Sequence, residues 1–284
     1  MPESETIKGL ERGLKVLQTL QTSATASLHE IHLATQISKP SLLRILNTLV
    51  RASMVSRRLA DGRYRLSAFA GMARKGDRHD RVAEAAGPVL DRLCQKVLWP
   101  SDLLVPAGGH MQRRETSRAH SRFALLPLAH MTSVGQPVGW LLTAVGRVYL
   151  AHCSDKEREA IVRRLRKTGK PEDRLANDPK RLERILAETR TRGYGTRDPI
   201  YLGGMYGEPP ADDGLAAIAV ALVDGNRVHG SINILWIRTA FTVEEFAARH
   251  LADLKAAAAE IVAALPAPAR SRAPRYGLPV QARQ

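Results

Sequence analysis

Cysteine is scarce in this chain of 284 residues, with Cys94 and Cys153 as its only two examples. Two cysteines so far apart exclude the disulfide framework of a small secreted domain, and no CxxC pair offers a metal knuckle. Long apolar runs are also missing, since none approaches the ~18 residues that a membrane-spanning helix needs. The opening MPESETIKG is polar and acidic, unlike a secretory signal. We therefore expect a bacterial cytoplasmic protein with no membrane partner.

Motifs of the common enzyme classes are absent as well. The chain has no GxSxG, HExxH, GxxxxGKS/T or GxGxxG, and its nine histidines are dispersed along the sequence. The glycine-rich segment 202–214 lacks the lysine and the following helix of a phosphate cradle. We interpret it as a loop that covers a pocket, with a metal-binding loop as the alternative. The sequence thus predicts no enzyme activity, no metal and no cofactor.

Acidic residues are also few relative to basic ones. The chain has 28 Asp and Glu against 43 Lys and Arg, which gives a formal net charge of +15. The imbalance is greatest at the start, where residues 1–81 hold 14 basic and 7 acidic side chains. Residues 82–265 hold 25 basic and 21 acidic side chains, although that segment is more than twice as long as the first. A basic balance of this kind favours a polyanionic partner. A hydrophobic content of 44% allows a buried core, so the chain is not a disordered polycation.

Helical patterns dominate the first 51 residues. Residues 7–20 place leucines and isoleucine on one helical face. Ser27, with Glu30 three residues later, is a capping-box pattern that begins a second short helix. After a turn, residues 37–51 show a Leu/Ile stripe on one side and Ser, Arg and Thr on the other. Two short helices separated by a tight turn are typical of a helix-turn-helix.

A hairpin is expected directly after the third helix. Residues 54–67 alternate in period two around Asp61-Gly62, and Asp-Gly between two such arms is a strong hairpin signal. This order of elements within about 65 residues is typical of a winged helix-turn-helix: two helices, a turn, a third helix and a hairpin.

The third helix has short polar side chains on its outer face. Ser41, Arg44 and Thr48 follow one another at spacings of three and four, so they share that face, which suits the ~12 Å major groove of B-DNA. Lys39 stands at the helix N-terminus, where free amides favour a phosphate. The hairpin arginines add contacts to the DNA backbone or minor groove. The alternative is an ordinary solvated face. The predicted DNA-binding residues are Lys39, Ser41, Arg44, Thr48, Arg57, Arg58 and Arg63.

The rest of the chain has an α+β pattern. An amphipathic helix at 82–98 joins the basic head to the larger C-terminal part. Strands are expected at 101–106, 110–117, 121–128, 215–223 and 228–237, and helices at 139–152, 155–167, 178–192 and 242–265. The Pro-rich basic segment 266–284 is expected to be a disordered tail, which either attracts DNA nonspecifically or is inert.

These residues resemble a known family. The segments "GLERGLKVLQTL", "ISKPSLLRILNTLVR", "GQPVGWLLTAVGRVYLAHC", "RGYGTRD", "LAAIAVAL" and "VHGSINIL" are similar to IclR-type bacterial transcriptional regulators, in the same order, over roughly residues 7–265. Within that family, "VLWPSDLLV" and "RRETSR" resemble most closely the activators of hydroxyphenylpropionate and related aromatic-acid catabolism. The resemblance implies an α+β chain with a winged helix-turn-helix at 1–72, a linker helix at 73–98, a GAF-like α/β effector and oligomerisation domain at 99–265, and a tail at 266–284.

The resemblance also implies a way of working. The chain would bind double-stranded DNA at a pseudo-palindromic operator as a homodimer or homotetramer, respond to a small-molecule effector, and contact RNA polymerase if it is an activator. A repressor of the same family is one alternative. A regulator whose C-terminal domain only oligomerises is another. The family's effector-lining positions fall on Thr143, Ala144, Val145, Arg197, Ala217, Asn233 and Leu235.

The effector class is inferred from the side chains at the last four of these positions. Family members that bind small oxo-acids carry Asp, Cys, Ser and Ser there, whereas this chain is more apolar and has a cation in place of the acid. An aromatic carboxylate fits this better than a small oxo-acid. A solvated loop position is the alternative for Arg197. Three tryptophans are candidates for stacking on an aromatic effector, or are ordinary core residues: Trp99, Trp140 and Trp236.

Two arginines on the expected strand 110–117 are candidates to meet an effector carboxylate. By strict alternation Arg114 and Thr116 face one side of the sheet, and Arg113 and Glu115 face the other. The resembling subgroup repeats Arg-Glu-Thr here, so Arg114 joins the predicted effector-binding residues. The alternative is an ion pair of either arginine with Glu115 or a surface acid.

The head departs from the family pattern at two positions. Gln36 stands in the turn where the family usually has Gly, and Pro40 stands where it usually has Ser. Proline is tolerated in a first helical turn but removes an amide that could bind phosphate. We expect the preferred DNA sequence to differ from the family's commonest sites.

Overall fold

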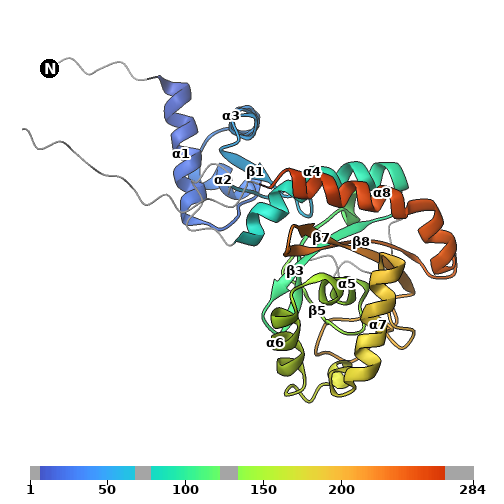
Figure 1. Ribbon diagram of the computed structural model, residues 1–284. Helices are drawn as coiled ribbons and strands as arrows, with labels where there is room; N and C mark the ends of the chain where they lie inside the picture. The colour runs from blue at the N-terminus through green and yellow to red at the C-terminus, as the bar shows by residue number, and fades with distance from the viewer. Residues whose placement is uncertain (1–6, 68–77, 122–133, 266–284) are drawn as a thin grey trace, which may run out of the picture.

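The computed structural model describes residues 7–67, 78–121 and 134–265. The head boundary expected at residue 72, most of the strand expected at 121–128, and the tail 266–284 lie outside these residues. Figure 1 shows the head as a lobe beside a larger lobe built on a sheet. The head elements are α1 (Lys8–Thr22), α2 (Leu28–Thr35), α3 (Lys39–Arg51), β1 (Val55–Arg57) and β2 (Tyr64–Leu66).

Local sequence signals set the ends of the head elements. The Ser27 hydroxyl accepts the Glu30 N–H at 3.2 Å, and the Glu30 carboxylate accepts the Ser27 N–H at 2.7 Å, so the expected capping box is confirmed. Strands β1 and β2 pair antiparallel, and Gly62 turns the chain between them with φ +67°. The inner leucines of α3 are buried against α1 and the hairpin. The head is thus a helix-turn-helix followed by a wing.

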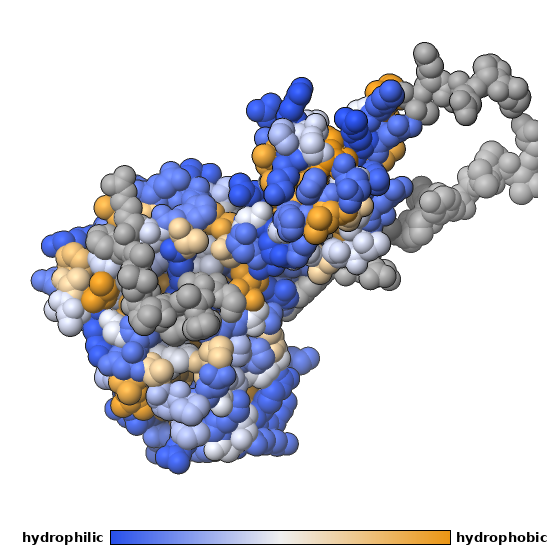
Figure 2. Space-filling model, turned by 180° about the vertical axis from the view of Figure 1, so that it is seen from behind, coloured by the Kyte–Doolittle hydropathy of each residue, from blue (hydrophilic) through white to orange (hydrophobic). Residues whose placement is uncertain are grey.

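The face of α1 is only half buried. Val16, Leu17 and Leu20 join the head core, but the first part of the expected apolar face does not. Ile7 is 72% exposed, and Leu10 and Leu14 remain largely exposed too. Figure 2, which shows the molecule from behind, has orange apolar patches among the hydrophilic surface of the head. An apolar strip of this kind on a surface helix marks a contact surface.

The larger lobe holds an antiparallel sheet between layers of helices. Its strand order is β5-β4-β3-β8-β7-β6, and α4 and α8 cover one face while α5 covers the other (Figure 1). The elements are α4 (Arg78–Val97), β3 (Ser101–Ala107), β4 (His110–Thr116), η1 (Arg118–His120), β5 (Pro137–Val138), α5 (Ala144–His152), α6 (Asp155–Leu165), η3 (Pro171–Asn177), α7 (Pro179–Arg192), β6 (Gly195–Thr196), β7 (Leu215–Asp224), β8 (Arg227–Ile237) and α8 (Val243–Ala263).

Each face of the sheet has its own core. Leu103 and Val105 pack toward α4 and α8, whereas Leu104 packs toward α5, as the alternation of a strand requires. The tryptophans belong to these cores: Trp236 stacks on Phe246 with ring centroids 3.8 Å apart, and Trp99 and Trp140 are buried. The three tryptophans are therefore core residues, which was the alternative to stacking on an aromatic effector.

The helix expected at 139–152 begins later, at Ala144. The segment before it folds back over the first turn, so that a Cβ added to Gly146 would lie 2.1 Å from the Trp140 carbonyl oxygen. Only glycine allows this close approach. The irregular segment and the N-terminus of α5 together form one wall of the cavity described below. In the described ranges, no helix is both long and apolar enough to cross a membrane.

Candidate DNA-binding face and internal cavity

The outer face of α3 carries most of the predicted DNA contacts. Lys39, Arg44 and Thr48 are exposed, and Ser41 is half-buried. The Thr48 hydroxyl donates to the Arg44 carbonyl at 2.9 Å, and the Ser38 hydroxyl donates to Ser41 at 3.1 Å. The helix therefore presents a guanidinium flanked by hydroxyl groups already held in place by their neighbours.

A groove runs along one flank of this face. Ser41, Arg44 and Thr48 line it together with α1, where Gly9 and Gly13 leave room because they have no side chains. On the other flank Asn47 is exposed, three residues after Arg44. An Asn amide at such a position reads adenine bidentately. Sequence reasoning missed Asn47, although the spacing of three from Arg44 could have identified it.

The turn before α3 is strained. Gln36 ends α2 in the left-handed region with φ 58°, and its side-chain amide donates to the Leu33 carbonyl at 2.8 Å. A residue with a Cβ is disfavoured in this conformation, which glycine adopts readily. Pro40 lies in the first turn of α3, where its missing N–H breaks no helical hydrogen bond. Both departures from the family pattern therefore fit the backbone, the first with strain.

The predicted wing arginines differ in their surroundings. Arg57 is exposed, with its guanidinium 5.8 Å from the centroid of the Tyr64 ring. Arg58 is only 15% exposed and pairs with Asp61 at 3.3 Å. Arg63 is bound to Glu30 at 2.6 Å and to the backbone and hydroxyl of Thr25. Of the three, Arg57 is the most available to DNA in this conformation.

The tip of the wing is attached to the larger lobe. Glu115 of β4 is 2% exposed, and its carboxylate accepts the N–H groups of Leu59 at 3.3 Å and Ala60 at 2.8 Å. Burial raises the pKa of Glu115, while hydrogen bonds from the Thr116, Ala60 and Leu59 amides act against that rise. A buried carboxylate of one lobe therefore holds the backbone of the other.

A cavity of about 40 Å³ lies between the sheet and the N-terminus of α5. Seven of the eight residues predicted for an effector line it: Thr143, Ala144, Val145, Arg197, Ala217, Asn233 and Leu235. Gly204 and Asp213 also line it, so the 202–214 segment covers part of the cavity, and Tyr201 lines it directly before that segment. Whether these residues bind a ligand stays a prediction.

Arg114 does not line the cavity; Arg113 does. Strand β4 has a bulge there, because Leu103 pairs with Glu115 and the next residue, Leu104, pairs with Arg113. The extra residue, Arg114, turns away and lies 3.7 Å from Asp80 of α4. The bulge shifts the alternation by one, so that Arg113 and Thr116 share the cavity face. The predicted assignment of the two arginines by strict alternation was wrong for this reason.

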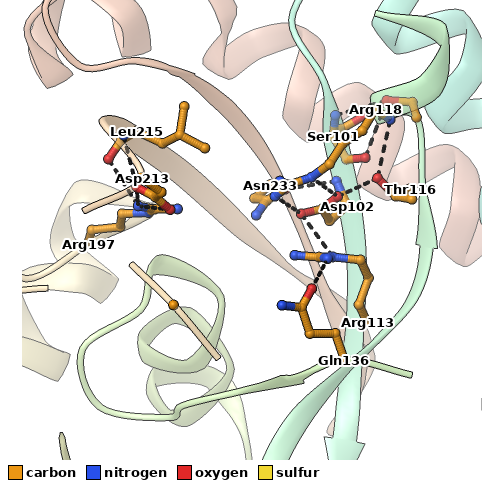
Figure 3. Close-up of polar contacts among 12 residues, drawn as sticks. Ser101, Asp102, Arg113, Thr116, Arg118, Gln136, Arg197, Asp213, Leu215 and Asn233 are labelled. Atoms are coloured by element: carbon orange, nitrogen blue, oxygen red, sulfur yellow. Dashed lines mark hydrogen bonds and ion pairs between the residues drawn. The ribbon is translucent and has the colours of Figure 1, made fainter. Parts of the chain in front are cut away.

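A buried ionic network forms one wall of the cavity. Asp102 of β3 is 1% exposed and pairs with Arg118 at 2.8 Å and Arg113 at 3.3 Å, and its carboxylate also accepts the Thr116 hydroxyl at 2.6 Å (Figure 3). Burial alone would raise the pKa of Asp102, but the two guanidiniums outweigh it and hold that pKa far below its usual range. Burial lowers the pKa of Arg113 to about 10, so this guanidinium also stays charged at neutral pH. Arg113 donates in addition to Gln136.

A second ion pair stands apart from this network in Figure 3. Arg197 donates to Asp213 at 2.7 Å and to the Leu215 carbonyl at 3.0 Å. The Arg197 guanidinium also lies 5.2 Å from the centroid of the Tyr201 ring, the one aromatic ring among the cavity-lining residues described. Arg197 is therefore not a solvated loop residue, although its charge is already matched by an acid.

The cavity includes residues that the sequence did not identify. Those with polar or aromatic side chains are Asp102, Arg118, Gln136, Tyr201 and Asp213, with Arg113 weighed but not chosen. Most lie in loops, at strand ends or in the 3₁₀ segment η1, where no periodicity marks the inward side. The quoted motif "RRETSR" did contain Arg118, and this repetition of arginines was the available signal. Within the described residues, no group of three or more His, Cys, Asp or Glu could hold a metal.

Several solved structures share this fold. The chain resembles an IclR family transcriptional regulator from Brucella abortus at 20% identity, covering 93% of this chain and 95% of that one with a TM-score of 0.50. An IclR homolog from Microbacterium sp. strain HM58-2 matches at 20% identity over 90% and 97%, with a TM-score of 0.51. A structure from Microbacterium hydrocarbonoxydans, an IclR homolog complexed with 4-hydroxybenzoate, matches at 21% identity over 90% and 98%, with a TM-score of 0.49. At these identities the likeness shows the fold alone.

Two family models match the chain itself. Residues 9–59 match the IclR helix-turn-helix domain, and residues 78–263 match the C-terminal domain of the bacterial transcriptional regulator IclR. The second match covers well over half of the chain and places the internal cavity in the family's effector domain. The two together describe a DNA-binding regulator and not an enzyme. The chain therefore belongs to the IclR family of bacterial transcriptional regulators.

Proposed function

We propose that this regulator binds a pseudo-palindromic operator as a homodimer or homotetramer, and that an aromatic carboxylic acid in the cavity controls that binding. The observation that carries the proposal is a buried cavity with three arginines around it, placed against the N-terminus of α5. Both features favour an anion. The cavity lies within residues 99–265, which we propose as the effector and oligomerisation domain of a cytoplasmic protein, after the DNA-binding head and the linker helix.

The head supports the DNA part of the proposal. Arg44 is exposed in the middle of the outer face of α3, with Asn47 and Thr48 beside it. Arg pairs bidentately with guanine and Asn with adenine in the major groove. Lys39 at the start of α3 and Arg57 on the wing provide phosphate contacts, which set the register of the head on DNA.

The apolar strip on α1 supports a homodimer. Ile7, Leu10 and Leu14 are exposed on one helical face, and a second copy of the same strip is self-complementary to it about a two-fold axis. Two heads joined in this way would meet half-sites one helical turn apart, or a multiple of it.

The wing contact offers a route from effector to DNA. Glu115 holds the wing tip, and its neighbours on β4, Arg113 and Thr116, hold Asp102 at the cavity. A ligand that moves this wall of the cavity would change the position of β4 and of the wing. Effector binding would thus shift the population of head positions, through this contact as well as through α4. We propose that the regulator activates transcription and contacts RNA polymerase as a further partner. Repression of transcription is the alternative.

The aromatic part of the proposal needs the cavity to open. About 40 Å³ holds a few water molecules or one carboxylate-sized group, so a ring enters only when the covering segment moves outward. Tyr201 provides a ring to stack on, and Leu104, Val138 and Leu235 provide apolar wall.

Thermal-shift screening of the full chain against aromatic and aliphatic acids tests the proposal. An acid that binds the folded state raises its stability by RT ln(1 + [L]/Kd). Stabilisation by a subset of acids supports a sensor. No shift across the whole panel would instead support a C-terminal domain that only oligomerises.

A further inference from the structure

Arg118 has an unusual environment for a buried guanidinium. Its side chain is 6% exposed, and its Nε and Nη2 donate to the Asp102 carboxylate at 3.1 and 2.8 Å. Its Nη1 atom is also buried, and within residues 7–67, 78–121 and 134–265 it has no hydrogen-bond partner. Arg118 is also one of the residues that line the cavity.

The charges around the cavity do not balance. Among the lining residues that the structure describes, three are arginines (Arg113, Arg118 and Arg197) and two carry carboxylates. Asp213 is paired with Arg197, and Asp102 is shared by the other two. A buried charge without a full counter-charge is costly, and one added anion removes that cost. The positive end of the α5 dipole at Ala144 and Val145 acts in the same direction.

We propose that Arg118 anchors the single carboxylate of the effector through Nη1, and that the cavity therefore selects monocarboxylates over dicarboxylates and over uncharged analogues. This inference rests on the proposed function, that the cavity binds an organic acid. Arg118 is held rigidly by Asp102, so little side-chain entropy is lost when its remaining donor takes up a carboxylate oxygen. The charge-assisted hydrogen bond forms at a side chain that is buried from bulk solvent, where such a bond is strong.

The charges of the lining residues also predict that the cavity disfavours a ligand with a second carboxylate. The first carboxylate completes the balance among the lining residues. A second one would add an unmatched negative charge to a cavity already lined by the buried carboxylates of Asp102 and Asp213. An amide or ester in place of the carboxylate would leave the excess positive charge unmatched.

Isothermal titration of the full chain with matched probes tests the ligand class. The probes are benzoate, 3-phenylpropionate, their carboxamides, and the dicarboxylate terephthalate. We expect at least one of the monocarboxylates to bind at least about tenfold more tightly than its own amide and than terephthalate, since one buried charge-assisted contact corresponds to about a factor of ten or more. Equal affinity for acid and amide, or tighter binding of terephthalate, would overturn the inference.

Variants separate Arg118 from the total charge. Arg118→Met should lower the affinity for the monocarboxylate at least about tenfold, while Arg114→Met, the matched change outside the cavity, should leave it unaltered. The double variant Arg118→Met/Asp102→Asn keeps the wild-type net charge of the cavity. Continued weak binding by it supports Arg118 as the anchor, and recovery to the wild-type affinity shows that charge alone suffices and overturns the role of Arg118.

Failure of the proposed role of Arg118 can be distinguished from misfolding and from failure of the proposed function. If Arg118→Met fails to fold, Arg118→Lys retains the charge but not the planar donor fork, and it should still weaken monocarboxylate binding several-fold; unchanged affinity would contradict the anchor. If no probe binds the wild-type chain, the proposed function fails together with this inference. If probes bind but Arg118→Met binds them equally well, only this inference fails.

Discussion

The Glu115 carboxylate accepts the Ala60 N–H at 2.8 Å and thereby joins the wing of the DNA-binding head to a strand of the effector domain. The two residues are 55 positions apart in the sequence. Glu115 stands between Arg113 and Thr116, whose side chains on the opposite face of β4 hold Asp102 at the cavity. One strand thus contacts the wing with one face and the cavity with the other.

Glu115→Gln should loosen this contact. A glutamine offers one acceptor oxygen in place of two, and it brings an NH₂ group toward amides that themselves donate. We expect the hydrogen-exchange protection of the Leu59 and Ala60 amides to fall about tenfold, the equivalent of ~1.4 kcal/mol. Asp91→Asn is the control, because Asp91 of α4 lines a groove that Glu115, Leu59 and Ala60 also line, but it does not bond to the wing amides. Unchanged protection in Glu115→Gln would show that the carboxylate does not hold the wing.

Arg44→Ala should weaken binding to the operator. A good bidentate contact to a base contributes about 1–3 kcal/mol, so we expect the Kd to rise between about 5- and 150-fold at fixed salt concentration. Fluorescence anisotropy with labelled operator measures this change. Arg163→Ala, at an exposed arginine of α6, removes the same charge far from the head and should leave the Kd nearly unchanged. Wild-type affinity in Arg44→Ala would place the DNA contacts elsewhere than on the outer face of α3.

Gln36→Gly should stabilise the head. Glycine relieves the left-handed strain at φ 58°, although it also increases the entropy of the unfolded chain, so a net gain of about 0.5–1 kcal/mol is expected. Urea unfolding measures it as a higher midpoint. The same exchange at Gln18, exposed inside α1, should instead cost about 1 kcal/mol. A loss of stability in Gln36→Gly would mean that the Gln36 hydrogen bond to Leu33 outweighs the strain.

Asp102→Asn should change how stability depends on pH. The folded-state pKa of Asp102 is lowered, so its stabilisation is present above the unfolded pKa of about 4 and is lost as the pH falls below it. At pH 7 the variant leaves two buried arginines without their carboxylate and should lose about 3–5 kcal/mol. Below about pH 4 the difference from the wild type should shrink. Urea unfolding at pH 7 and below about pH 4 measures this difference in stability. If the stability of the two proteins changed with pH in parallel, the buried ionic network would be contradicted.

Local signals predicted the head well because each acts within a few residues. The Ser27–Glu30 capping box and the Asp61-Gly62 hairpin are both present as expected. The leucine pattern of α1 was less informative, since periodicity shows which residues share a face but not what covers that face. Ile7 therefore looked like core and is exposed.

The cavity could be predicted only in part. Seven lining residues followed from the family resemblance, but the strict alternation that placed Arg114 and Arg113 on opposite faces fails at a bulge that depends on pairing with β3. Arg118 lies in a 3₁₀ segment and reaches Asp102 sixteen positions earlier in the chain. Contacts of this kind depend on the path of the chain in three dimensions and leave no repeat in the sequence.

The most direct test of the account is a titration of operator DNA with the full chain, with and without a saturating acid identified by thermal shift. We predict that the acid changes the Kd for the operator about 5- to 150-fold, the range of a coupling free energy of about 1–3 kcal/mol. The same acid should have no effect on DNA binding by Arg118→Met at a concentration that saturates only the wild type. An unchanged operator Kd for the wild-type chain saturated with an acid that binds it would contradict the account.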